Sequence, residues 1–162
     1  MIVLSIDPSL SSTGYAVIDD NKKLICKGKI NVSQKETTDE RVFQIITKLN
    51  YLPKADYIIF EDGFVGKNVQ GSLKLAELRG AIIFNFRSQQ IPVIHQQPKE
   101  IRKNFGLSGN AKKEEVANKV QEYYPFLQEQ IGPYSDKQNK DKTSDIYDAI
   151  SIGLSFVINQ KE

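Results

Sequence analysis

Cysteine, histidine and long apolar runs are all scarce in this chain of 162 residues. Its one cysteine, Cys26, excludes an internal disulfide, and one cysteine with one histidine is too few for a zinc site. No apolar run approaches the roughly 20 residues that a membrane-spanning helix needs. The opening residues, MIVLSID, also lack the basic start and small-residue cleavage site of a secretory signal. These absences together predict a cytoplasmic protein without a membrane segment.

What the chain does contain suits a single folded domain. Hydrophobic residues make up 40% of the sequence, enough for one core at this length, so we expect one domain over residues 1–162. The formal net charge of +2 is too small to indicate nucleic-acid binding, although lysine and arginine can still cluster locally.

Strand-like and helix-like segments alternate along the chain, which predicts an α/β fold with a mixed sheet. Three short apolar segments joined by short turns, at 2–6, 13–18 and 24–30, are typical of an antiparallel meander. Further strands are expected at 56–61 and 91–95. Apolar spacing predicts helices over 36–50, 68–90, 97–104, 112–123 and 144–159, with a polar loop at 127–144 before the last one.

The helix expected at 68–90 carries apolar residues on two faces. A helix that is apolar on two sides needs two partners. One partner is the sheet, and the other is either a further segment of the chain or a second copy of it in a homodimer. The two faces consist of Val69, Leu73, Ala76 and Ile83, and of Leu75, Leu78, Ile82 and Phe86.

Four carboxylates stand where apolar segments end or begin. Asp7 ends the first expected strand and Glu61 the fourth, and neighbouring strands of one sheet bring such end residues together. Asp145 and Asp148 are three residues apart and therefore share one face of the C-terminal helix. That face continues with Ile152, which indicates that it turns inward.

Each acid also has a purely structural interpretation. Asp145 and Asp148 in a first helical turn complement the helix dipole, Asp7 before a proline suits an Asx-turn, and Glu61 suits a loop. Four converging carboxylates, however, repel one another and require cations between them. Oxygen ligands suit Mg²⁺ or Mn²⁺, and two such ions can promote hydrolysis of a phosphodiester.

Four segments, in order along the chain, resemble the RuvC family of Holliday-junction resolvases within the RNase H-like (retroviral integrase) superfamily. Members of this family occur in bacteria and some bacteriophages. The resemblance covers almost the whole chain and rests on IDPSLSSTGYAVI, IIFEDGFVGKNVQGSLKLAELRGAI, GNAKKEEV and SDIYDAISIG. It implies an RNase H-like fold, in which helices flank a five-stranded mixed sheet of three antiparallel strands followed by two parallel ones.

The resemblance also implies an activity, that of a crossover junction endodeoxyribonuclease. Such an enzyme acts as a homodimer that nicks four-way junctions, and other branched DNA such as forks and flaps, in recombination, repair or phage DNA processing. Cleavage would leave 5′-phosphate and 3′-hydroxyl ends. The implied ligands of two Mg²⁺ or Mn²⁺ ions are Asp7, Glu61, Asp145 and Asp148.

Two basic residues complete the implied active site. Lys113 matches a family lysine at its edge, although KKEEV also suits ordinary surface pairing. Arg102 stands where the family has another lysine. Because arginine cannot release its proton, Arg102 is unsuited to a role in proton transfer.

Phe64 occupies the place where the family presents an aromatic ring to the bases of the junction, and stacking on an unpaired base is worth about 1–3 kcal/mol. In GFVG the same phenylalanine also suits a core position. A local excess of basic residues in 66–90 and 99–119 could neutralise phosphates, although such charge also suits a solvated surface. The other expected DNA contacts are Lys67, Asn68, Lys74, Arg79, Lys99, Lys103 and Lys112.

Two features depart from the family pattern. Ser9 replaces the glycine usual in the first turn, where the backbone is then less permissive. The segment PYSDKQNKDKT, at 133–143, looks longer than in bacterial members, and the sequence assigns it no role.

Two other classes of protein share parts of this pattern. An actin-like ATPase has a similar hairpin and sheet, but this chain lacks a second phosphate loop and is short for two lobes. A non-catalytic junction-binding protein is the other alternative, and the complete set of acids argues against it.

Overall fold

Five strands form one mixed sheet in the order β3-β2-β1-β4-β5. The structure, a computed structural model, describes residues 1–63, 66–137 and 142–160. The first three strands pair antiparallel, whereas β1 pairs parallel with β4, and β4 parallel with β5. This confirms the expected topology of an RNase H-like sheet. The strands are β1 (Ile2–Asp7), β2 (Ser12–Asp19), β3 (Leu24–Asn31), β4 (Tyr57–Glu61) and β5 (Val93–Gln96).

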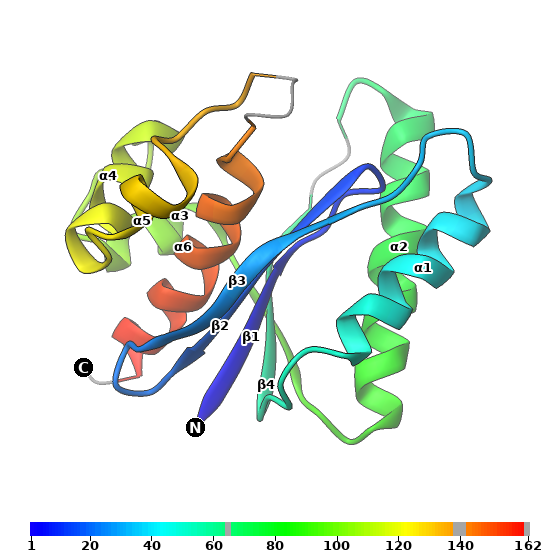
Figure 1. Ribbon diagram of the computed structural model, residues 1–162, viewed down its shortest axis with the longest axis horizontal. Coiled ribbons are helices and arrows are strands. Elements are labelled where there is room, and N and C mark those ends of the chain that lie inside the picture. Colours follow the sequence, from blue (N-terminus) through cyan, green and yellow to red (C-terminus); the bar gives the residue numbers. More distant parts are fainter. Residues whose placement is uncertain (64–65, 138–141, 161–162) are drawn as a thin grey trace.

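Helices cover both faces of this sheet, α1 and α2 on one side and α3 to α6 on the other (Figure 1). Their bounds follow the sequence pattern closely. Among the described residues, no helix is both long enough and apolar enough to cross a membrane. The helices are α1 (Thr38–Asn50), α2 (Val69–Ser88), α3 (Pro98–Asn104), α4 (Lys113–Tyr123), α5 (Leu127–Ile131) and α6 (Ser144–Asn159).

The short helix α5 lies within the segment 127–144, which the sequence predicts to be entirely loop. That prediction is wrong because Leu127 is fully buried in the core beneath α6, and this burial stabilises a turn whose other residues are mostly polar. Gly132 ends the helix at a φ of 83°, a left-handed conformation that glycine adopts without strain.

Alternating strand residues divide the core into two layers. Val3, Ile18 and Ile59 belong to the layer under α3 to α6. Their neighbours Leu4 and Phe60 belong to the layer under α1 and α2. The alternation follows from the two-residue period of a strand, which sends successive side chains to opposite faces.

Helix α6 lies directly against β1 and β2, and nearly all of its residues are buried. Two glycines allow this approach. A Cβ at Gly14 would overlap the backbone carbonyl of Asp145, and a Cβ at Gly153 would lie 2.5 Å from Ser5 Oγ. Ser5 Oγ in turn donates a 2.6 Å hydrogen bond to the carbonyl of Ala149. The start of α6 is therefore held tightly over the end of β1.

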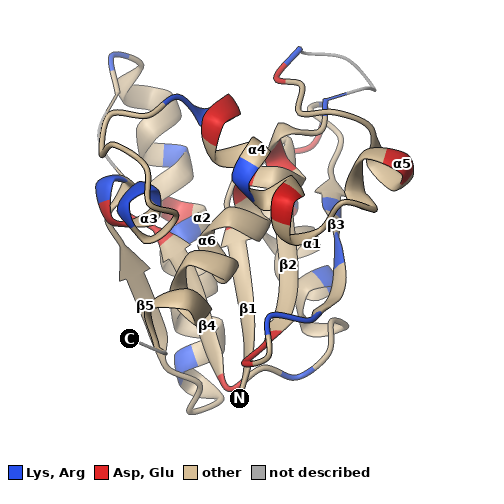
Figure 2. Ribbon diagram, turned by 90° about the vertical axis from the view of Figure 1, so that its left-hand side faces the viewer, with Lys and Arg blue, Asp and Glu red and all other residues tan. Residues whose placement is uncertain are grey.

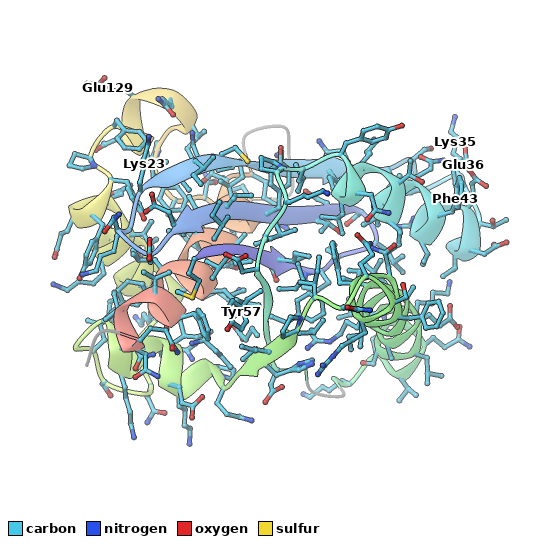
Figure 3. The ribbon with its side chains drawn as sticks, turned by 90° about the horizontal axis from the view of Figure 1, so that it is seen from below. Lys23, Lys35, Glu36, Phe43, Tyr57 and Glu129 are labelled. Atoms are coloured by element: carbon cyan, nitrogen blue, oxygen red, sulfur yellow. The ribbon has the colours of Figure 1, made fainter. Side chains whose placement is uncertain are left out.

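At the far end of the same helix, Phe156 packs against Tyr57 at the start of β4, with ring centroids 6.0 Å apart. Figure 3 shows Tyr57 near the middle of the view and Phe43 projecting from α1 at the edge of the molecule. Phe43 is 66% exposed. In the layer formed by α1 and α2, Phe43 is therefore an apolar side chain left exposed.

Of the two apolar faces that the sequence predicts for helix α2, one is buried against the sheet and the other is largely exposed. Leu78 and Ile82 are fully buried, with Phe86, against the sheet. The opposite face exposes Val69 and Leu73, at 57% and 61%. Ile83, expected on that exposed face, is partly buried against the core, and its place is taken by Phe84, which is 76% exposed.

The turn after β1 explains how serine replaces glycine there. Ser9 Oγ accepts hydrogen bonds of 3.4 Å from the backbone N–H groups of Ser11 and Ser12. Thr13 Oγ1 donates to the Ser9 carbonyl at 2.6 Å. Among the described residues, positive φ angles outside glycine occur at Lys22 and Gln90 alone, so Ser9 is not strained. A serine therefore serves this turn through its hydroxyl.

Candidate active site

The ends of β1 and β4 place two acids side by side. Ile6 pairs with Phe60 across these parallel strands, and the next residues along each strand are Asp7 and Glu61. Asp7 and Glu61 therefore end two adjacent strands of the sheet, where the sequence analysis expects them.

The first turns of α6 bring the other two acids to the same place. Gly14, beneath the Asp145 backbone, is also the residue that pairs with Asp7 across β1 and β2. Asp145 is buried and the Asp148 side chain is 17% exposed. Both therefore face inward, as their shared helix face and the burial of Ile152 require.

Burial and mutual repulsion raise the pKa of three of these carboxyl groups. Burial raises the pKa of Asp7 to about 7, with further contributions from Asp148, Asp145 and Glu61, while Lys113 opposes the shift. The pKa values of Glu61 and Asp148 are also raised, in both cases chiefly by burial. Because Asp7 is affected by all three other acids, the four carboxylates form one electrostatic cluster.

Two lysine ammonium groups neutralise the helix acids. Lys113 Nζ lies 2.5 Å from Asp148 Oδ2, and Lys142 Nζ lies 2.7 Å from Asp145 Oδ1. Burial alone would lower the pKa of Lys113, but the Asp148 carboxylate overrides this and raises it. Lys113 thus stands at the acid cluster, as the resemblance implies.

Lys142 is a member of the site that the sequence analysis missed. Its signal is the i, i+3 spacing to Asp145, which places two opposite charges on one side of the start of α6. Its carbonyl accepts a 2.8 Å hydrogen bond from Lys29 Nζ of β3, which ties the segment before α6 to the sheet.

The donor set suits a hard divalent cation. Asp145 Oδ2 is buried and has no hydrogen-bond partner among the described residues, which leaves one carboxylate oxygen available to a ligand. Carboxylate oxygens are what Mg²⁺ and Mn²⁺ prefer. Among the described residues, no three acidic, histidine or cysteine side chains already form a metal site. Two of the acids instead pair with ammonium groups in this structure, Asp148 with Lys113 and Asp145 with Lys142.

A cleft of about 490 Å³ opens over Asp7 and Glu61, between them and the start of α2. Lys113 lines its edge, and Lys67 and Asn68 line the α2 side. Of the predicted DNA contacts, these two therefore lie next to the acids. Asn68 also caps the N-terminus of α2, because its Oδ1 accepts a 3.0 Å hydrogen bond from the Gly71 N–H.

Lys74 lines an adjoining hollow of about 450 Å³, which shares Pro8, Gly71 and Leu75 with the cleft. Arg41 lies in the same hollow, where its guanidinium donates to the Leu10 carbonyl at 2.5 and 2.9 Å. The hollow extends the cleft along α2 with further positive charge.

Arg79 also lines the cleft, but its guanidinium is engaged within the protein. Its Nη2 donates a 2.6 Å hydrogen bond to the backbone carbonyl of Glu61, and its Cζ lies 5.5 Å from the Phe60 ring centroid. Burial lowers the pKa of Arg79, while the neighbouring Asp62 and Glu61 oppose that shift. The side chain expected to bind DNA therefore braces the end of β4.

The basic residues of α3 lie on the other side of the sheet, where Figure 2 shows lysine and arginine gathered on that helix. Arg102 Nε donates to the Ala111 carbonyl at 2.8 Å, and the positive charge of Arg102 opposes the rise that burial causes in the pKa of Glu61. Lys99, Lys103 and Lys112 are exposed. They do not line the cleft, and Phe64 lies outside the described residues.

An RNase H-like sheet with a cluster of carboxylates at its cleft defines a class of proteins, the metal-dependent nucleases of this fold. The family model described as "Crossover junction endodeoxyribonuclease RuvC" matches residues 3–155. This chain belongs to the RuvC family, whose nucleases are metal-dependent. The protein therefore belongs to the class of nucleases that act on DNA crossovers.

Individual relatives agree with this placement. The chain is 36% identical to the RuvC of Chlorobium phaeovibrioides over 125 residues, which cover 72% of this chain and 66% of that protein. It is 31% identical to the RuvC of Ehrlichia ruminantium over 170 residues, which cover 99% of each.

A solved structure also shares the fold. The RuvC of Thermus thermophilus superposes with a TM-score of 0.77 at 22% identity, covering 99% of this chain and 96% of that one. The same Thermus protein has been solved in complex with a Holliday junction substrate, and that chain superposes with a TM-score of 0.75 at 21% identity.

Proposed function

We propose that this protein is a metal-dependent endonuclease that cleaves four-way DNA junctions, and other branched DNA such as forks and flaps, by paired nicks. The observation that carries the proposal is that Asp7 of β1 and Glu61 of β4 line one cleft, while Asp145 and Asp148 of α6 help to raise the pKa of Asp7. The names of the relatives and the Thermus complex with a Holliday junction support the same class of substrate.

Asp7, Glu61, Asp145 and Asp148 would hold two Mg²⁺ or Mn²⁺ ions. Bound in such a site, the ions activate a water molecule and stabilise the leaving oxygen of a phosphodiester. Hydrolysis adds water across the bond between phosphorus and the 3′ oxygen, so the products carry 5′-phosphate and 3′-hydroxyl ends.

Lys113 and Arg102 support this chemistry through charge. Lys113 stands at the edge of the cleft, where its ammonium can offset the negative charge that grows on the attacked phosphate. Arg102 stays protonated, so it stabilises the ionised form of Glu61 and transfers no proton.

DNA affinity must come from the flanks, because a cluster of acids repels phosphate. We assign the backbone contacts nearest the acids to Lys67, Asn68 and Lys74, which line the cleft and the adjoining hollow. A second set, Lys99, Lys103 and Lys112, extends the path over α3 and the start of α4. Phe64 remains our candidate for stacking on an unpaired base.

The exposed face of α2 is our proposed dimer seam. Val69, Leu73 and Phe84 expose apolar side chains along one line of the helix, and Gly80 between them leaves open space where a Cβ would stand. A second copy packed there gives two active sites, one for each strand to be nicked. The protein would act in the cytoplasm, where Cys26 stays reduced.

The decisive experiment offers labelled four-way junction, fork, flap and linear duplex to the purified protein in Mg²⁺. We expect the branched substrates to be cut and Asp7→Asn to bind the junction in Ca²⁺ or EDTA without cutting it in Mg²⁺. Equal cutting of linear duplex would contradict structure selectivity. Binding without cutting by the unmodified protein would favour a non-catalytic junction-binding protein, and ATP hydrolysis without cutting an actin-like ATPase.

A further inference from the structure

The segment between α5 and α6, which the sequence leaves without a role, has a firmly built stem. The backbone N–H groups of Thr143 and Ser144 both donate to the Ser135 carbonyl at 2.9 Å. Thr143 Oγ1 accepts from the Ser135 N–H at 2.8 Å and donates to the Pro133 carbonyl at 2.7 Å. These bonds hold residues 133–135 against the start of α6.

Tyr134 sits at the centre of this stem. Its ring meets that of Tyr147 of α6 edge to face, with centroids 6.0 Å apart. Tyr147 is itself anchored, because its hydroxyl donates to the Gly132 carbonyl at 2.9 Å and accepts from Gln121 Nε2 at 2.8 Å. The Tyr134 ring is therefore held in place against Tyr147, the residue that directly precedes Asp148.

The hydroxyl of Tyr134 is buried and has no hydrogen-bond partner among the described residues. Native proteins rarely leave a buried hydroxyl unsatisfied, and an exception calls for a function. Burial raises the pKa of Tyr134 to about 12, and the charged groups that act on it include Asp148, Lys113 and Asp7. The phenol is therefore a protonated, unused hydrogen-bond donor beside the acid cluster.

Asp148 is the acid that can accept a hydrogen bond from the Tyr134 hydroxyl. Its Oδ2 now accepts from Lys113 Nζ at 2.5 Å. An ammonium and a divalent cation repel each other, so a carboxylate that turns from Lys113 towards a cation loses this hydrogen bond. Carboxylates that hold metals are oriented by hydrogen bonds from the groups behind them, and loss of such a group typically weakens metal binding by about 10–100-fold.

We infer that Tyr134 is a positioning residue, whose hydroxyl donates a hydrogen bond to Asp148 when Asp148 holds a divalent cation in place of Lys113. This inference rests on the proposed function, because it requires that Asp148 bind a metal. It gives a role to the described ends of the segment 133–143, which supply the site with Tyr134 and Lys142.

The test is Mn²⁺ binding, measured by titration calorimetry without DNA, in Tyr134→Phe. We expect about 10-fold weaker binding, with a metal-free melting temperature equal to or above that of the unmodified protein, since the hydroxyl removed has no partner. Tyr124→Phe is the matched control. The Tyr124 hydroxyl donates to the Lys22 carbonyl at 2.7 Å, so this variant should melt at lower temperature and bind Mn²⁺ normally.

Unchanged Mn²⁺ affinity in Tyr134→Phe would overturn the inference, as would a loss of metal-free stability like that of Tyr124→Phe. Asp148→Asn separates this failure from failure of the proposed function. If Asp148→Asn abolishes Mn²⁺ binding while Tyr134→Phe leaves it unchanged, only the role of Tyr134 is wrong. If both variants bind Mn²⁺ normally, the metal site itself is wrong.

Discussion

Gly14 lies so close to the backbone of Asp145 that a single added carbon on Gly14 would overlap the Asp145 carbonyl. The same glycine pairs with Asp7 across β1 and β2. One residue without a side chain therefore decides how near the acids of α6 come to the acid of β1.

Replacing Gly14 with alanine should lower the free energy of unfolding by about 1–3 kcal/mol, as overpacking of a core does. Because the clash is with backbone, α6 must move, and junction cleavage should fall further than the loss of folded protein explains. Urea unfolding and cleavage rates of the folded fraction measure the two effects. Gly109→Ala is the control, since its Cβ would meet Lys99 at an ordinary 3.6 Å. Identical behaviour of the two variants would show that the close approach is unimportant.

Arg79 should act on cleavage through Glu61 rather than through DNA affinity. Lysine cannot reproduce both the hydrogen bond to the Glu61 carbonyl and the stacking on Phe60. We expect Arg79→Lys to cut junctions about 10-fold more slowly, with unchanged junction affinity in Ca²⁺. Arg87→Lys, in the exposed last turn of α2, should change neither. Weaker binding with a smaller salt dependence in Arg79→Lys would instead indicate a phosphate contact.

Ionisation of Asp7 should destabilise the metal-free protein. Its pKa is about 7 in the folded state against an ordinary 3.8, so the folded state holds the proton more tightly than the unfolded one. The stability this confers is complete below about pH 4 and is lost as the pH rises to about 7, by up to about 1.4 kcal/mol per pH unit.

Asp7→Asn should remove the loss of stability that ionisation of Asp7 causes, because asparagine carries no charge. In EDTA, its melting temperature should exceed that of the unmodified protein at pH 8 by several degrees, and the difference should shrink towards pH 4. Added Mg²⁺ should stabilise the unmodified protein and leave Asp7→Asn largely unaffected. A difference in melting temperature that does not depend on pH would argue against a perturbed Asp7.

The dimer should dissociate when charge is placed on the exposed face of α2. We expect Leu73→Glu with Phe84→Glu to be a folded monomer by light scattering and circular dichroism, with paired nicking reduced to slow single nicks. Phe126→Glu is the control and should remain dimeric, because the exposed Phe126 directly precedes α5, which lies on the other side of the sheet (Figure 1). Charge at Leu78 or Ile82, which are fully buried, should instead unfold the protein. A dimeric double variant would place the seam elsewhere.

Local sequence determined much of this protein. Strand and helix bounds differ from the sequence pattern by no more than about two residues, apart from α5, because apolar periodicity and turn residues act over a few neighbouring positions. The same local logic placed Asp7 and Glu61 at strand ends, and Asp145 and Asp148 on one helix face. These acids suited a metal site, and the resemblance of four segments to the RuvC family indicated a nuclease.

Only the tertiary structure decided how the parts of the site meet. It turned Leu78 inward and Phe84 outward and committed Arg79 to the Glu61 carbonyl. It also packed Tyr134 against Tyr147 and paired Lys142 with Asp145. These outcomes depend on the close packing of segments that lie far apart in the chain, such as Gly14 against Asp145. A local pattern records which residues can be buried, but side-chain partners are set by the shapes that meet when the layers pack.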